Sequence, residues 1–182
     1  MSRPFLAFSY KVSGSSSTAR VALWRALREL GAGYLQQSVA VLPSSTTLRA
    51  RLEELRDRAA ASGGAATLAA LRFIHAEDEE RFVAESRAAR DEEYGELGEN
   101  CQRLIYELDR ETELGKFAFT ELEESEGDLA ALRRWLEKIS ARDYFDAPKR
   151  EEARSAVERA EGRLRDYAKE VYRRDTAQAK SH

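Results

Sequence analysis

The stretch ARVALWRALRELGAGYLQQSVAVLP, residues 19–43, decides the fold of the front of the chain. Its first half places Leu23, Leu27 and Leu30 at i, i+4 and i+7, which predicts an amphipathic helix with one core-facing stripe. Two glycines then end that helix. The second half carries β-branched residues up to Pro43 and predicts either one bent strand or a short hairpin.

Strand and helix signals alternate on both sides of this stretch. We expect a strand at 5–12, a second amphipathic helix at 46–62 and a last strand at 66–74. The serine-rich loop at 13–18 supplies Ser17 or Thr18 as a helix N-cap. This β-α-β-β-α-β order predicts a ferredoxin-like sandwich, with two helices on one face of a mainly antiparallel sheet.

From Ala76 onward every pattern is helical. A long helix is expected at 76–114 and a second one up to about residue 142, starting with a capping box of Thr120 and Glu123. Asp146 as N-cap and Pro148 in the first turn predict the start of a third helix.

The third helix carries apolar residues at a 4-3-4-3-4 spacing from Ala153 to Val171, which indicates a bundle or coiled-coil seam. The expected fold class is therefore α+β, a ferredoxin-like domain at 1–75 followed by a three-helix C-terminal bundle at 76–174. The polar residues 175–182 are expected to form a disordered tail.

Charge is distributed unevenly along the chain, whose net charge is −3. Residues 1–74 hold 10 basic and 4 acidic side chains, whereas residues 75–182 hold 20 basic and 29 acidic ones. The basic front either docks against the acidic remainder or meets a polyanion.

Several classes of function are disfavoured. One cysteine, Cys101, allows neither an intramolecular disulfide nor a cysteine-based zinc site, and it lies on an apolar stripe. His75 lies about 39 Å from Cys101 along one helix, too far for a nucleophile–base pair. The acidic run between Asp91 and Glu99 is expected to form a solvated face rather than a metal site. We therefore expect no enzyme and no cofactor.

The apolar stretch at the N-terminus is too short for a signal peptide, and no apolar run is long enough to span a bilayer. A cytoplasmic location without a membrane partner is therefore expected.

Two groups of basic residues are candidate binding sites. The candidate nucleic-acid site consists of Lys11, Arg20, Arg25 and Arg28, with Tyr10 and Trp24 nearby. Trp24 itself is expected to be packed rather than stacked on a base. No helix-turn-helix signature accompanies these residues. The candidate site for chromate or another oxyanion consists of Arg133, Arg134, Lys138 and Arg142.

Several blocks of the sequence resemble the N-terminal region of the ChrB family. They are SYKV, residues 19–43, RDEEY (90–94), GKFAFTELEE (115–124), LRRWLEKISARDYF (132–145), and AP followed by REEA (147–153). The resemblance runs from about residue 5 to 173. It implies a place in chromate resistance, where ChrB is a chromate-responsive regulator whose fuller members carry a second, C-terminal domain.

A weaker, fold-level resemblance covers residues 5–74. It concerns the small ferredoxin-like nuclease of CRISPR spacer acquisition and the middle domain of PaaX-type repressors. In the nuclease an aspartate at the end of the first strand binds the metal, and Lys11 stands at the matching position here. A cation there repels Mg²⁺, which disfavours nuclease activity.

The resulting hypothesis is a ChrB-like regulatory or accessory protein that binds DNA or a protein partner as a homodimer. Residues 34–42, as an edge strand, and the seam at 153–171 are the candidate dimer contacts. The alternatives are a divergent metal-dependent nuclease and a protein-interaction scaffold.

Overall fold

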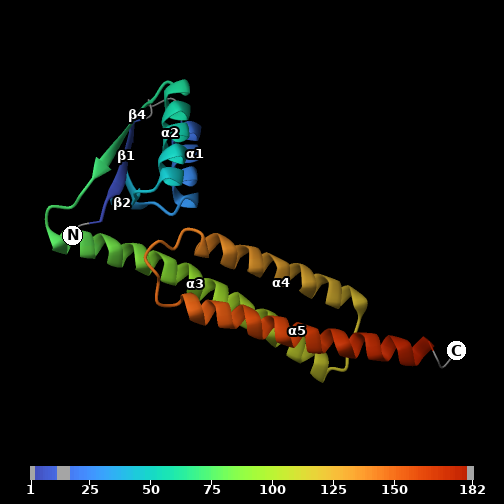
Figure 1. Ribbon diagram of the computed structural model, residues 1–182. Helices are drawn as coiled ribbons and strands as arrows, with labels where there is room; N and C mark the ends of the chain where they lie inside the picture. Colours follow the sequence, from blue (N-terminus) through green and yellow to red (C-terminus); the bar gives the residue numbers. More distant parts are fainter. Residues whose placement is uncertain (1–2, 12–16, 180–182) are drawn as a thin grey trace. The chain divides into compact units, whose positions relative to one another are not determined.

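A computed structural model describes residues 3–11 and 17–179, and shows a mixed α+β fold (Figure 1). The chain divides into two compact units, which we call the sheet unit (1–87 with 142–145) and the helical unit (88–141 with 146–182). This division differs from the expected boundary at residue 75, because the first turns of the long helix and a short later segment pack with the sheet.

The sheet unit contains the six elements that the sequence predicts, in the same order. They are β1 (Phe5–Lys11), α1 (Ser17–Glu29), β2 (Gly33–Gln36), β3 (Val39–Pro43), α2 (Thr46–Ala61) and β4 (Ala65–Leu71). Of the two alternatives for 34–43, the short hairpin is correct. Val12 and the loop before α1 lie outside the described residues, as does the side chain of Ser17.

The four strands form one antiparallel sheet in the order β2-β3-β1-β4, so β2 and β4 are its edges. Strand β4 pairs with β1 over seven residues, from Leu71 opposite Phe5 to Ala65 opposite Lys11. Strand β2 is shorter, and its register shifts between Tyr34 and Gln36. Figure 1 shows α1 and α2 on the same face of the sheet.

Two apolar clusters fill the two faces of this sheet. Leu6 and Phe8 pack with the leucines of α1 and α2, including Leu23, Leu27 and Leu52, which confirms the predicted stripes. The opposite face carries a smaller cluster, formed by Phe5, Val41, Phe82 and Phe145. Successive residues of a strand point to opposite faces, which explains why Phe5 and Leu6 belong to different clusters.

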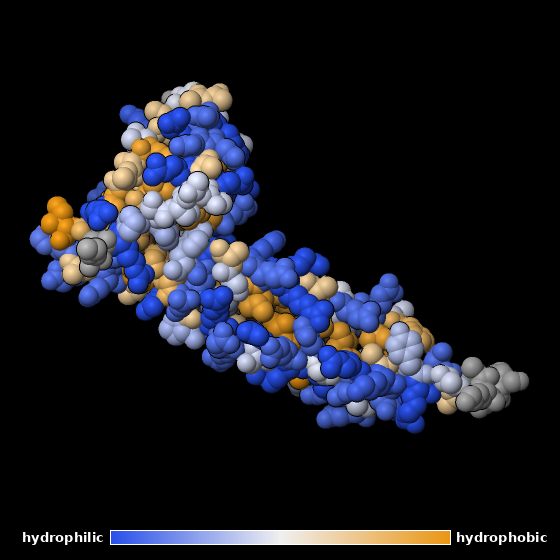
Figure 2. All heavy atoms as spheres, in the orientation of Figure 1, coloured by the Kyte–Doolittle hydropathy of each residue, from blue (hydrophilic) through white to orange (hydrophobic). Residues whose placement is uncertain are grey.

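The helical unit contains most of α3 (Ala76–Glu113), together with α4 (Phe119–Ser140) and α5 (Arg150–Ala179). One cluster of buried residues joins the three helices, among them Leu97, Cys101, Ile139, Val157 and Leu164. The predicted seam residues from Ala153 to Val171 are all buried. In Figure 2 hydrophobic side chains gather in a strip along these helices, between hydrophilic ones.

Two predicted helix starts are wrong. Helix α4 begins at Phe119, and its N-cap is Ala118 in an extended conformation, without a side-chain cap from Thr120. Helix α5 begins at Arg150 rather than Pro148. Asp146 has φ 55°, a left-handed conformation that differs from the extended backbone of an N-cap, and its carboxylate accepts a hydrogen bond from Arg150.

Helix α5 continues to Ala179, so the described part of the expected tail is helical. Within the described part of the chain no helix has both the length and the apolar character that a bilayer crossing needs.

Candidate functional site

The outer face of α1 is a basic surface with an aromatic ring in it. Arg20, Arg25 and Arg28 are all exposed. Trp24 is 40% exposed, and the guanidinium carbon of Arg28 lies 4.9 Å from the centre of its ring, in cation–π geometry. The expectation that Trp24 is packed is therefore wrong: its indole lies at the surface beside a guanidinium.

The spacing of α1 explains this face. Arg20, Trp24 and Arg28 follow one another at i+4 and share a side of the helix, whereas Leu23 and Leu27 point into the core. No acidic residue lies between positions 17 and 28. Arg20 and Arg25 form no ion pair with any residue that the structure describes, so their charge faces solvent.

The side chains of Tyr10 and Lys11, at the end of β1, point to opposite faces of the sheet. Tyr10 is buried in the cluster under α1 and α2, and burial raises the pKa of its phenol, while nearby Arg20 opposes the shift. Lys11 is exposed and, one residue further, points to the opposite face of the sheet. The structure thus groups the three arginines of α1 and leaves Lys11 outside that group.

A segment from much later in the chain adds a fourth arginine to the end of α1. The Nη1 atom of Arg142 donates to the carbonyl oxygen of Arg28 at 3.4 Å, and the Tyr144 hydroxyl donates to that of Leu30 at 2.7 Å. Both side chains satisfy carbonyls at the C-terminal end of the helix, where positive charge is favoured.

Gly31 permits this approach. Its φ is 78°, and a Cβ atom there would lie 2.7 Å from Arg142 Cβ. The rest of the segment is anchored below the sheet, where Phe145 packs on Phe5 and Phe82 and its carbonyl accepts from Arg87 Nε at 2.6 Å. Sequence reasoning missed this contact, because 114 residues separate Arg28 from Arg142; the aromatic pair Tyr144–Phe145 was the available signal.

The residues of the predicted oxyanion group belong to two different units. Arg142 belongs to the sheet unit, whereas Arg133, Arg134 and Lys138 lie on α4 in the helical unit. Arg133 Nε donates to a Glu161 carboxylate oxygen, and that hydrogen bond lowers the pKa of Glu161. Arg134 and Lys138 remain as an exposed pair one turn apart.

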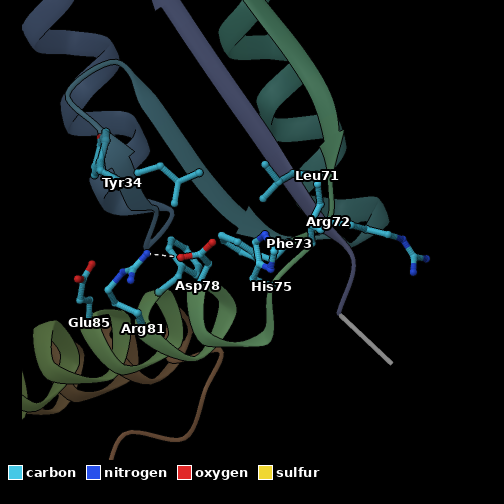
Figure 3. A pocket seen from close by; sticks show the side chains of 11 residues that line it. Tyr34, Leu71, Arg72, Phe73, His75, Asp78, Arg81 and Glu85 are labelled. Carbon is cyan, nitrogen blue, oxygen red and sulfur yellow. Dashed lines mark hydrogen bonds and ion pairs between the residues drawn. The ribbon is translucent and has the colours of Figure 1, made fainter.

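A cavity of about 470 Å³ lies in the sheet unit beside the start of α3 (Figure 3). Tyr34, Phe73 and Phe82 line it together with His75, and Asp78 and Arg81 form an ion pair within the lining. Figure 3 shows the side chain of Arg72 extending away from the other labelled residues. Burial, with a contribution from Tyr10, raises the pKa of Tyr34 to about 12, so its phenol stays protonated at neutral pH.

Two residues of the acidic run on α3 have structural roles. Asp91 accepts a hydrogen bond from the backbone N–H of Lys149 at 2.8 Å, just before α5, and Glu93 pairs with Arg90 at 2.8 Å. Among the described residues no group of three or more His, Cys, Asp or Glu side chains is arranged to hold a metal ion.

Comparison with known families relates the chain to a described family. A family model described as "Protein ChrB, N-terminal" matches residues 20–178, most of the chain and nearly all of the elements described above. No curated protein and no solved structure shows significant similarity to the chain.

Proposed function

Because the chain belongs to the family described as Protein ChrB, N-terminal, we propose that it is a regulatory or accessory protein of the chromate-resistance response that binds nucleic acid through α1. Membership of this family relates the chain to chromate resistance. The binding mode is our inference from the surface of the sheet unit.

The observation that carries this proposal is the stacking of Arg28 on an exposed Trp24 between Arg20 and Arg25. Arginines that face solvent neutralise phosphates and release counterions, which supplies affinity without base-specific contacts. An exposed indole offers a plane on which an unpaired base stacks, with about 1–3 kcal/mol per base. Arg142, at the end of the same helix, extends the basic surface.

The fold supports recognition rather than catalysis. The element order and the strand order β2-β3-β1-β4 agree with a ferredoxin-like sandwich, and the shared core of α3, α4 and α5 agrees with a three-helix bundle. Lys11 is exposed at the end of β1, where a metal-dependent nuclease of this fold would need a carboxylate. We therefore propose that the protein is not an enzyme.

We also propose that the protein forms a homodimer through an open edge of the sheet. The seam from Ala153 to Val171 is buried inside its own unit, which leaves β2 and β4 as the available edges. Strand β4 is the longer, and it contains no charged residue or proline that would discourage pairing. Sedimentation velocity of Leu35→Pro and Thr67→Pro proteins distinguishes the two edges, because only the contact strand is sensitive to proline.

Fluorescence anisotropy with labelled single-stranded and duplex DNA tests the nucleic-acid proposal. Arg25→Glu/Arg28→Glu is expected to weaken binding at least about tenfold, because it reverses two of the charges that meet phosphates. Affinity of the unmodified protein should also fall steeply between 50 and 200 mM salt, as is typical of phosphate contacts.

The matched control is Arg134→Glu/Lys138→Glu, the same change in charge on an exposed pair of α4. It should leave the affinity within about twofold. Equal loss in both double variants, or no binding at micromolar protein, contradicts the proposal and favours a protein-interaction scaffold. Cleavage of the same DNA with Mg²⁺ or Mn²⁺ would instead favour the nuclease.

A further inference from the structure

The helical unit contains an open groove between α3 and α4. Two adjoining cavities of about 430 and 260 Å³ form it, and both are lined by Glu107 of α3 and Asp128 of α4. Its α3 side runs from Asn100 to Glu111 and its α4 side from Glu121 to Trp135. At 1.5 Å per residue the α3 side is about 17 Å long, or roughly three helical turns.

The floor of the larger cavity is apolar, whereas the smaller cavity is lined mostly by charged and polar side chains. Leu104 and Leu132 come from the buried core, and the partly buried Trp135 packs against that core beside them. On α3 the lining residues recur at three- and four-residue steps, so one continuous face of the helix borders the groove. The apolar face of an amphipathic helix carries anchoring residues at the same spacing.

The rim of the groove is acidic. Glu107, Glu121, Glu124 and Asp128 are exposed, and none forms an ion pair with a residue within the described ranges 3–11 and 17–179. The lining also contains two basic residues, Arg103 and Arg110, and Arg110 already pairs with Glu111. The local charge also acts on Tyr167: burial is the main cause that raises the pKa of its phenol, and Glu121 and Glu111 add to the shift.

We infer that this groove binds a basic amphipathic helix of a partner protein. The apolar floor receives the helix's apolar residues, and lysines or arginines on its flanks meet the acidic rim. The charge of the rim disfavours nucleic acid and anionic membranes, whose phosphates it repels. This surface lies on the helical unit and is separate from the basic surface of α1.

A synthetic peptide provides the test. It has about 18 residues, leucines at i, i+3, i+4 and i+7, lysines elsewhere and a fluorescent label; its matched control carries glutamates in place of the lysines. The protein is expected to bind the lysine peptide at micromolar concentration and the glutamate peptide at least about tenfold more weakly.

Variants of α4 locate the binding site. Glu124→Lys/Asp128→Lys, on the rim, should weaken binding at least about tenfold. Glu123→Lys/Glu126→Lys makes the same change on the opposite face of the same part of the helix, and it should leave binding within about twofold. Equal effects of the two double variants overturn the proposal, as does the absence of binding at 100 µM protein.

Trp135 in the floor of the groove serves as a fluorescent reporter, because Trp24 is the second of the two tryptophans in the chain and can be replaced. In the Trp24→Phe protein all tryptophan emission comes from Trp135, and it should shift to shorter wavelength when the lysine peptide covers the groove. An unchanged emission at saturating peptide contradicts binding in the groove. If Glu124→Lys/Asp128→Lys instead abolishes self-association of the protein alone in sedimentation velocity, the occupant is a second copy and the proposal is wrong.

Discussion

The arginines of α1 and several arginines of the helical unit have different surroundings. In the helical unit Arg133, Arg154 and Arg163 each pair with a carboxylate, either one turn further along the same helix or on a neighbouring helix. On α1, Arg20 and Arg25 meet no carboxylate among the residues that the structure describes. Arginines with carboxylate partners stabilise a fold modestly, whereas arginines without such partners remain available to an external anion. The same residue type therefore indicates structure in the paired positions and binding on the outer face of α1.

The largest expected effect tests whether the two units are separate in stability. Leu27 and Leu97 are both fully buried, one in each unit. Each Leu→Ala substitution should lower the free energy of unfolding of its own unit by about 2–5 kcal/mol, because it leaves a cavity. Trp24 reports the sheet unit and Trp135 the helical unit, each in a protein whose other tryptophan is replaced by phenylalanine.

Urea titrations followed by tryptophan fluorescence measure both effects. Leu27→Ala is expected to move the Trp24 transition much more than the Trp135 transition, and Leu97→Ala to do the reverse. If either substitution moves both transitions equally, the chain unfolds as one cooperative body and the comparison of two units loses its energetic basis.

A smaller effect tests the contact of the segment 142–145 with α1. In Gly31→Ala the new Cβ atom is strained by the left-handed φ of 78° and lies 2.7 Å from Arg142 Cβ. We therefore expect the free energy of unfolding to fall by about 2–4 kcal/mol. Gly63 follows α2 with a φ of 73°, and a Cβ atom added there would meet no other atom within 4 Å. Gly63→Ala should therefore cost only about 1–2 kcal/mol.

The difference between the two glycine variants isolates the contact with Arg142. Urea titration of the Trp24 signal measures both. Equal costs would show that Arg142 moves away freely, and that it is no lasting part of the basic surface at the end of α1.

Local periodicity made much of the fold predictable. The leucine stripes of α1 and α2 and the seam of α5 repeat at helical spacing, and a helix with one apolar face must bury that face wherever it packs. The hairpin at 34–43 remained ambiguous, because a bent strand and two short strands share the same alternation. No local pattern predicts the strand order, since the pairing of β1 with β3 and β4 depends on contacts across the whole sheet; only the expectation of a ferredoxin-like sandwich implied it.

The candidate sites were less predictable, and for a similar reason. Arg20, Arg25 and Arg28 share a helix, so their grouping follows from sequence alone. Arg142 was expected to belong with Arg133, but α4 ends at Ser140 and the next residues pack in the other unit. The capping box at Thr120 failed in the same way, because the chain enters α4 through an extended Ala118 that sequence spacing does not reveal.

The smallest expected effect concerns the ion pair between Arg133 and Glu161. The hydrogen bond from Arg133 lowers the pKa of Glu161, and the two side chains are 53% and 26% exposed, so solvent screens the pair. Arg133→Gln should therefore cost only about 0.2–1 kcal/mol at pH 7. Because the folded pKa of Glu161 lies below the unfolded one, this stabilisation is fully present above about pH 4.3 and is lost as the pH falls through the folded pKa.

Urea titrations of the Trp135 signal at pH 7 and pH 3 measure this loss, with Arg134→Gln as the control. Arg134 is the next residue on α4 and pairs with no carboxylate among the described residues, so its variant should show no such pH dependence. Arg25→Gln, read by Trp24, should behave like the control although it lies on the basic surface. A pH-dependent loss of stability in Arg25→Gln would mean that Arg25 pairs with a carboxylate of the folded protein, because only an ionised partner in the fold produces that dependence.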